Sequence, residues 1–280
     1  MRTKTKNGRP LVVISDFRFL LLKLQTDYVL EARDPLEQKN RLKSLPKDLT
    51  GAYYQVIRFR MTPGDLLFAC RILSWIIHAQ RILKMSELCE ALAIQIGEPS
   101  LDKGDIPEPD EILRPCCGLV NHAHDTDLVT LSHETVRSFL NSVDFRSLLE
   151  ERKVRSLLSH SELSKICLTF LQLPVFDMPS DRIAELSHEW LAEFKFGNYA
   201  ALFWGVHARL SEREVELEII ILKTFNSATR RDTMEALRSD YETDGMSLFH
   251  VLIQNGLTFL FISPNIGSIE QEWVSLSQSS

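Results

Sequence analysis

The chain has 280 residues, 44% of them hydrophobic and 25% charged, which is typical of a globular protein. Its net charge of -6 opposes binding of the whole molecule to polyphosphate, so a nucleic-acid role would need a local basic patch. The five cysteines are scattered through apolar helical patterns, which indicates intracellular usage and not a disulfide framework. Every apolar run is much shorter than the roughly 20 residues of a membrane span. We therefore expect a cytoplasmic protein.

The N-terminal part is expected to be helical. Apolar residues fall at helical spacing between residues 16 and 33. After a polar break, a second helix carries Tyr53, Tyr54 and Ile57. Pro63 and Gly64 should end this second helix, and Asp65 is placed to cap the next one.

The central part has the element order of a winged-helix domain. Residues 65–94 predict two helices joined by a tight turn, the second of them capped near Ser86. Residues 97–111 contain three prolines and two glycines and should form a surface loop. A short helix, a hairpin over residues 119–131 and a helix over residues 133–140 should follow.

Residues 143–240 predict a helical connector. Ser211 and Glu214 should form a capping box at the start of one of its helices. Paired helices with short breaks indicate a bundle or connector. The expected breaks are at residues 174–179, Gly197 and residues 209–210.

Six segments carry a family resemblance through their joint order. They read "LPKDLTGAYYQVI", "ILSWIIHAQRILKMSELCEALAI", "DEILRPCCGLV", "VTLSHETVRSFL", "KICLTFL" and "NYAALFWGVHARL". Over residues 17–225 they resemble the region that follows the nucleotidase core in fungal NACHT and ankyrin-repeat proteins, which are NLR-like. The middle segments resemble the inositol-deacylase-type winged helix of that family. Residues 244–257, "DGMSLFHVLIQNGL", are similar to the opening of an ankyrin repeat.

The resemblance implies a mainly α fold with a small β-hairpin, in four parts. These are a helical tail of a NACHT-like region (1–62), a winged-helix domain (63–142), a helical connector (143–240), and a degenerate ankyrin onset with a polar tail (241–280). Two departures limit it. Arg81-Ile82-Leu83 stands where the family has Arg-Pro-Leu, and the P-loop pattern that cradles a triphosphate does not occur in this sequence. ATP-driven switching is therefore not expected here.

The pair His133 and Glu134 imitates a zinc-protease signature. A zincin needs a second histidine four residues after the first, and that position is Arg137. We interpret His133 as the start of a helix, with Glu134 favourable near its N-terminus. Contiguity also prevents Ser132, His133 and Glu134 from forming a catalytic triad, whose members must converge from separate segments.

A second candidate is the group Cys116, Cys117, His122 and His124. Adjacent cysteines point in diverging directions, and the usual spacing of a zinc loop is missing. We predict a half-buried helix end followed by a polar hairpin. The densest aromatic stretch is expected to be core; it contains Trp190, Phe194, Phe196, Tyr199, Phe203 and Trp204.

The third helix of the domain carries Glu108, Asp110 and Glu111 against Arg114 alone. Phosphate would repel such a recognition helix. The sequence thus predicts a non-catalytic interaction and regulatory scaffold, with no catalytic, cofactor or metal residues and no nucleotide, nucleic-acid or membrane partner. Protein partners would bind through the helical connector and the ankyrin-like end, which should pack back on the helix ending near Phe225. The alternative is a winged-helix DNA-binding regulatory protein.

Overall fold

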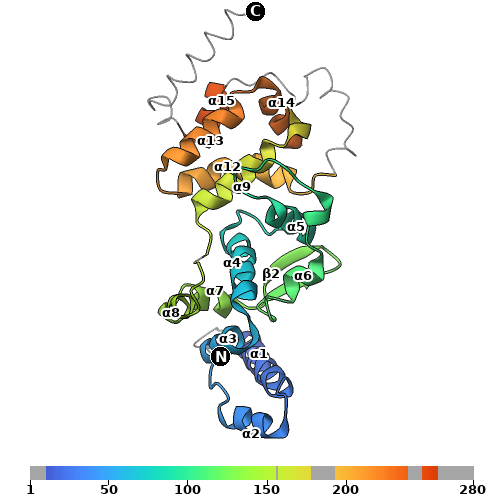
Figure 1. The fold of residues 1–280 in the computed structure, drawn as a ribbon, viewed down its shortest axis with the longest axis vertical. Helices are drawn as coiled ribbons and strands as arrows, with labels where there is room; N and C mark the ends of the chain where they lie inside the picture. The colour runs from blue at the N-terminus through green and yellow to red at the C-terminus, as the bar shows by residue number, and fades with distance from the viewer. Residues whose placement is uncertain (1–10, 156, 178–192, 239–247, 258–280) are drawn as a thin grey trace, which may run out of the picture. The chain divides into compact units, whose positions relative to one another are not determined.

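The computed structural model describes residues 11–155, 157–177, 193–238 and 248–257. Over these residues the chain is mainly helical, with one two-stranded hairpin (Figure 1), which confirms the predicted fold class. The elements, in chain order, are α1 (Leu11–Leu30), α2 (Pro35–Lys43), α3 (Leu49–Arg60), α4 (Pro63–His78), α5 (Met85–Ala93), η1 (Lys103–Asp105), α6 (Pro109–Leu113), β1 (Val120–Ala123), β2 (Leu128–Leu131), α7 (Glu134–Leu140), α8 (Val143–Arg152), α9 (His160–Leu171), η2 (Pro174–Phe176), α12 (Gly197–Leu210), α13 (Val215–Phe225), α14 (Ala228–Leu237) and α15 (Leu248–Gln254).

The chain divides into two compact units. The first comprises Met1–Ala69, Leu113–Asn121 and Leu131–Ser156. The second comprises Cys70–Ile112, His122–Thr130 and Leu157–Ser280. Helix α4 and both strands therefore contribute residues to each unit.

In the first unit, α3 packs on α1, α7 and α8. The ring of Tyr53 lies 5.5 Å from that of Phe139, and its hydroxyl is hydrogen-bonded to Thr135 Oγ1 at 2.8 Å. Arg152 of α8 donates to the carbonyl of Arg58 and, at 3.2 Å, to that of Met61. A guanidinium is favourable there because the carbonyl end of a helix carries partial negative charge.

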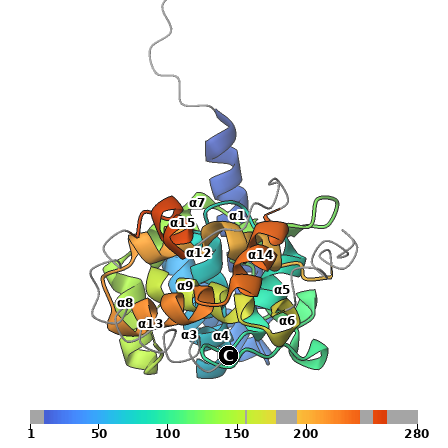
Figure 2. The same ribbon diagram turned by 90° about the horizontal axis from the view of Figure 1, so that it is seen from above.

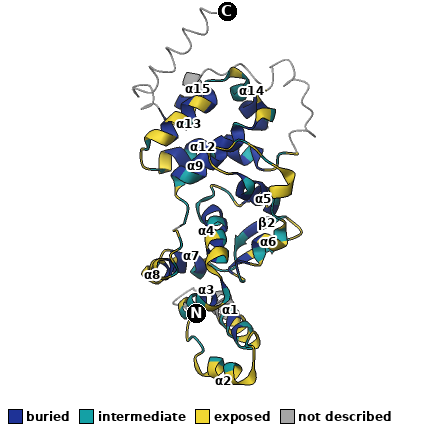
Figure 3. Cartoon of the chain, in the orientation of Figure 1, coloured by how far each residue is buried: buried dark blue, intermediate teal, exposed yellow. Residues whose placement is uncertain are grey.

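The polar break expected before α3 is wrong, because residues 35–43 form α2. The side chain of Asp34 accepts from the backbone amide of Glu37 at 2.8 Å, and Pro35 occupies the first turn. An aspartate cap followed by proline is a standard helix start. None of the residues of α2 is buried, in contrast to most of α9 (Figure 3).

Three predicted caps are wrong. Helix α4 begins at Pro63, and Thr62 and Asp65 bond reciprocally, so Asp65 is the inner partner of a capping box. Helix α5 is preceded by Lys84, whereas Ser86 donates to Asp127 at 2.9 Å. Ser211 ends α12, and Glu214 is the residue before α13.

In the second unit, α9, α12, α13, α14 and α15 form one bundle in both views (Figure 1, Figure 2). Helices α9 and α12 make its main interface, where Ser164 Oγ donates to the carbonyl of Trp204 at 3.0 Å. The break predicted at Gly197 lies directly before it, over residues 193–196, and Gly197 begins α12. A Cβ there would lie 2.8 Å from Leu237 Cδ2, so the close approach of α14 favours glycine.

Helix α15 belongs to the segment compared with an ankyrin repeat, whose first residues lie outside the described residues. Val251, Leu252 and Leu257 are buried within the second unit, and Gly256 after the helix has a φ of +65°. A Cβ on Gly205 of α12 would lie 2.0 Å from Asn255 Oδ1. The end of α15 therefore packs against α12 through a glycine.

Candidate functional site

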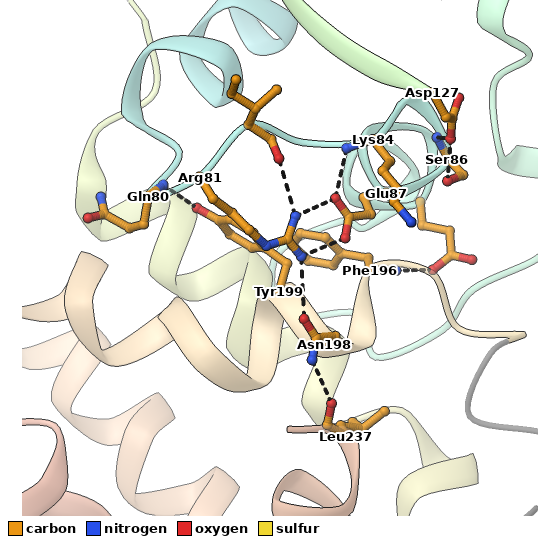
Figure 4. A network of polar contacts seen from close by, with 12 residues as sticks. Gln80, Arg81, Lys84, Ser86, Glu87, Asp127, Phe196, Asn198, Tyr199 and Leu237 are labelled. Atoms are coloured by element: carbon orange, nitrogen blue, oxygen red, sulfur yellow. Dashed lines mark hydrogen bonds and ion pairs between the residues drawn. The ribbon is translucent and has the colours of Figure 1, made fainter. Parts of the chain in front are cut away.

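Arg81 lies in the turn between α4 and α5 and forms a two-pronged ion pair. Its guanidinium donates to the two carboxylate oxygens of Glu87 at 2.7 and 2.6 Å (Figure 4). The Glu87 side chain is 7% exposed. The hydrogen bonds to Glu87 raise the pKa of Arg81 against the opposing effect of burial. Planar, paired recognition of this kind is specific to arginine.

The same arginine reaches α12. Its guanidinium carbon lies 5.3 Å from the centre of the Tyr199 ring, a cation–π distance. It also donates to Asn198 Oδ1 at 3.4 Å, and Asn198 donates to the carbonyl of Leu237 at 3.0 Å (Figure 4). The turn before α5 is thus joined to α12 and to the end of α14.

Glu90 of α5 is buried and supplies the acceptor for the start of α12. Its two carboxylate oxygens accept the backbone amides of Lys195 at 3.0 Å and Phe196 at 2.9 Å. Burial raises the pKa of Glu90, and the two amide hydrogen bonds oppose that increase. The unpaired amides of a helix N-terminus favour an anion, so α5 caps α12 in trans.

We call Arg81, Glu87, Glu90, Asn198 and Tyr199 the α5–α12 network. Beside it, Trp75 packs edge-on against Phe196 and Tyr199, with ring centres 5.3 and 5.8 Å away. These are favourable aromatic geometries in a buried position. All five side chains of the network engage other parts of the same unit.

The turn of the hairpin lies at the N-terminus of α5. Met85 donates its amide to the carbonyl of Asp127 at 2.7 Å, and Val129 donates to that of Leu83 at 2.9 Å. Asp127 has a φ of +59°. One of its carboxylate oxygens accepts from Ser86, and the other lies 2.9 Å from His122 Nε2. Burial raises the pKa of Asp127, but hydrogen bonds from His122 and Ser86 outweigh it and hold the pKa below its ordinary value.

A two-stranded hairpin that follows three helices and is hydrogen-bonded to the start of the second has the arrangement of a wing. Residues 60–149 match the family model described as the winged helix domain of GPI inositol-deacylase. The chain contains a winged helix domain.

One curated relative has low sequence identity to the chain. The chain is 25% identical over 187 residues to "Azaphilone pigments biosynthesis cluster protein L" of Monascus ruber. The alignment covers 64% of this chain and 38% of that protein, so the chain spans well under two thirds of the relative's length. No solved structure matches the chain. Within the described residues, no helix combines the length and apolar character needed to cross a membrane.

In the winged helix domain, Ser86, Asp127 and His122 form a row that differs from a hydrolase triad. The carboxylate lies in the middle, so the serine hydroxyl bonds to Asp127 and not to the histidine. A nucleophilic serine needs the imidazole as its direct base. The row therefore fastens the wing to α5.

His133 occupies the position predicted for it, before α7. Its Nδ1 accepts from the backbone amide of Thr135 at 3.1 Å, so the imidazole caps the helix. Glu134 lies in the first turn and pairs with Arg137 at 3.2 Å. The interpretation of His133 as a helix start is confirmed.

The four-residue metal candidate has no shared geometry that holds an ion. Cys116 is buried, and Cys117 has a φ of +48° with a pKa that burial raises. The rings of His122 and His124 lie 4.5 Å apart. In the part of the chain that the structure describes, no three histidine, cysteine or acidic side chains are placed to ligate a metal.

Helix α6 is shorter than expected for a recognition helix, since it ends at Leu113. Asp110 and Glu111 of α6 are exposed, as are Glu108 before it and Arg114 after it. Three of the aromatic residues predicted to be core are fully buried: Phe196, Tyr199 and Trp204. Trp190 lies outside the described residues.

The sequence pattern did not predict the roles of Arg81, Glu87 and Glu90, although Glu87 stands three residues after Lys84, a capping-box spacing.

Proposed function

We propose that the chain is a non-catalytic regulatory scaffold in which the winged helix domain is a protein-packing module. The α5–α12 network carries this proposal. Glu90 accepts the amides of Lys195 and Phe196, and Arg81 contacts Asn198 and Tyr199, so two charged side chains of the domain are bound to the helical connector of the same chain. A polar group already committed to internal hydrogen bonds has little left to offer a substrate.

We further propose that this scaffold is cytoplasmic, NLR-like, and independent of nucleotide. The support is the family resemblance of residues 17–225 and the match of residues 60–149 to a winged helix domain. Protein partners would bind through the connector and the ankyrin-like end. The Monascus ruber relative is named after a pigment gene cluster and not after a reaction, so its name favours no particular chemistry.

A DNA-binding regulator is the second candidate, because many winged helices read the major groove with their third helix. The exposed acids of α6 oppose it. Duplex binding releases counterions, so a true DNA complex weakens by orders of magnitude between about 50 and 200 mM salt.

The test is fluorescence anisotropy of a labelled mixed-sequence duplex, titrated with the full chain at low and at moderate salt. The scaffold proposal predicts no saturable binding at micromolar protein. The variant Glu108→Lys with Asp110→Lys serves as a matched reversal, because it changes the net charge of residues 108–114 from -2 to +2 without changing a buried residue. Tight, salt-sensitive binding by the unmodified chain would contradict the proposal and favour the DNA regulator.

A further inference from the structure

Three side chains form a hydrogen-bonded chain in the core of the second unit. Tyr199 and His207 both lie on α12, and the tyrosine oxygen is 2.9 Å from His207 Nε2. His207 Nδ1 is 2.8 Å from Nδ1 of His160, the first residue of α9. His207 is 0% exposed and Tyr199 is equally buried. We call these three residues the histidine–tyrosine chain.

The direction of the hydrogen bonds is fixed by Gln80. Its backbone amide donates to the Tyr199 oxygen at 3.1 Å. Within the described residues, His207 Nε2 is the only acceptor that the Tyr199 hydroxyl has. The hydroxyl therefore donates to His207 Nε2, and His207 must carry its hydrogen on Nδ1. That hydrogen is donated to His160 Nδ1, which must be unprotonated.

Neutral imidazoles are thus the only state in which every bond of the chain is made. A proton on His160 Nδ1 would place two N–H groups against each other. Reversing both histidine tautomers would restore that bond, but would leave the buried Tyr199 hydrogen without an acceptor, which is costly. A second proton on His207 would set an N–H against the tyrosine O–H.

Among the residues that the structure describes, no carboxylate contacts either imidazole. From α4, the ring of His78 lies 4.7 Å from that of His160, and Trp75 lies edge-on to His207 at 6.2 Å. From the turn and α5, Arg81 faces the Tyr199 ring, with Glu87 committed to Arg81. From α9, the buried thiol of Cys167 completes the environment. Burial, then His160 and His78, lower the pKa of His207 to about 3, and burial lowers that of His160.

We propose that the histidine–tyrosine chain makes the connector pH-sensitive, so that its helices separate more readily at acidic pH. Below neutral pH, His160 and His207 would take up protons more readily once the chain has opened, which favours loss of the bonds that hold α12 to the start of α9 and to the turn at Gln80. Because Tyr199 also belongs to the α5–α12 network, the loosening would reach the contact with the winged helix domain. This inference does not depend on which partner the scaffold binds.

The direction in which pH changes the stability of the closed state follows from proton linkage. A histidine whose pKa is lowered by folding binds fewer protons in the closed state than in the open one. Its stabilising effect is complete above its ordinary pKa of about 6.5 and is lost as the pH falls below that value toward the folded pKa. For His207, whose folded pKa is about 3, this increases the opening equilibrium about tenfold between pH 7.5 and 5.5, and His160 acts in the same direction.

The experiment is amide hydrogen exchange of the full chain at pH 7.5 and 5.5, expressed as protection factors so that intrinsic rates cancel. Protection of peptides from α9 and α12 should fall at least tenfold in the wild-type chain, while peptides from α3 change less. His160→Asn keeps an acceptor near the position of Nδ1 and cannot titrate, so its loss of protection should be smaller than that of the wild type. His124→Asn, an exposed histidine on the wing, should behave like wild type.

Two results would overturn the proposal. One is an equal loss of protection in the wild type and in His160→Asn. The other is an increase in the melting temperature with equimolar Zn²⁺ at pH 7.5 that EDTA reverses, since the histidines would then hold a metal.

A second measurement applies if His160→Asn does not fold. The ¹⁵N chemical shifts of the wild-type imidazoles should report His207 protonated on Nδ1 alone and His160 unprotonated on Nδ1. A charged imidazole or the reverse tautomers at pH 7.5 would also contradict the proposal.

Discussion

Glu90 and Phe196 are 106 positions apart in the sequence, yet the carboxylate of one accepts the backbone amide of the other at 2.9 Å. The second helix of the winged helix domain thereby supplies the anion at the N-terminus of α12. The amide of Lys195 shares the same carboxylate at 3.0 Å. The winged helix domain and the connector are therefore linked by a buried charge, and the consequences can be measured.

Glu90→Ala should lower the free energy of unfolding by about 1–3 kcal/mol, because the amides of Lys195 and of the buried Phe196 lose their acceptor. Glu90→Gln keeps one amide oxygen and should cost less. Urea denaturation monitored by circular dichroism measures both. Glu108→Ala, an exposed acid without a side-chain hydrogen bond, is the control and should change stability by less than about 0.5 kcal/mol. Equal effects of Glu90→Ala and the control would contradict the capping role.

The same residue makes a prediction about pH. The folded pKa of Glu90 is raised, so the folded state binds more protons than the unfolded state above the ordinary value of 4.5. The stability that Glu90 contributes is fully present below that value and is lost as the pH rises through the folded pKa. Relative to Glu90→Gln, the wild type should therefore lose stability from pH 4.5 upward. A difference that stays constant with pH would show that the pKa is not raised.

Arg81→Ala should destabilise the fold by about 1–3 kcal/mol, since it leaves the buried Glu87 carboxylate without its ion pair. Arg81→Lys should recover only part of this, because an ammonium cannot bind both oxygens in the same plane. A double-mutant cycle with Glu87→Ala isolates the coupling between the two side chains. Lys39→Ala on exposed α2 is the matched control. A coupling energy near zero would contradict a stabilising ion pair between Arg81 and Glu87.

Gly205→Ala tests the docking of α15. An added methyl group would lie 2.0 Å from Asn255 Oδ1, so the helix must move, at a cost of about 1–3 kcal/mol. Asn255→Gly in the same chain should restore part of the loss. Gly64→Ala is the control, since the nearest atom to its added methyl group would be 3.8 Å away.

Deleting residues 244–280 should likewise lower the thermal midpoint, and an unchanged midpoint would mean that the segment does not stabilise the connector.

Local patterns in the sequence predicted the helix pairs of the winged helix domain, the hairpin and the position of His133. These features depend on residues close together in the chain. The predicted caps at Asp65, Ser86 and Ser211 are wrong because each lies two or three residues from the residue that directly precedes the helix, and several side chains nearby are able to cap. Helix α2 was missed because it buries no residue and so lacks an apolar face.

The α5–α12 network was beyond the reach of the sequence for a different reason. Glu90 stands in an amphipathic helix, where a charged residue predicts a solvated position, yet it is buried by a segment 105 and 106 residues later. The local sequence around His207 does not indicate that His160 of α9 lies beside it. Contacts of this range are set by tertiary packing, which overrides the local pattern.

The most direct test of the account is the exchange rate of the Lys195 and Phe196 amides in the full chain, compared between wild type, Glu90→Ala and Glu108→Ala. If the winged helix domain is a packing module joined to the connector, the two amides should be protected in wild type and in Glu108→Ala. In Glu90→Ala they should exchange at least tenfold faster while α3 keeps its protection. Unprotected amides in the wild type, or equal rates in all three proteins, would contradict the claim that the domain is joined to the connector through this carboxylate.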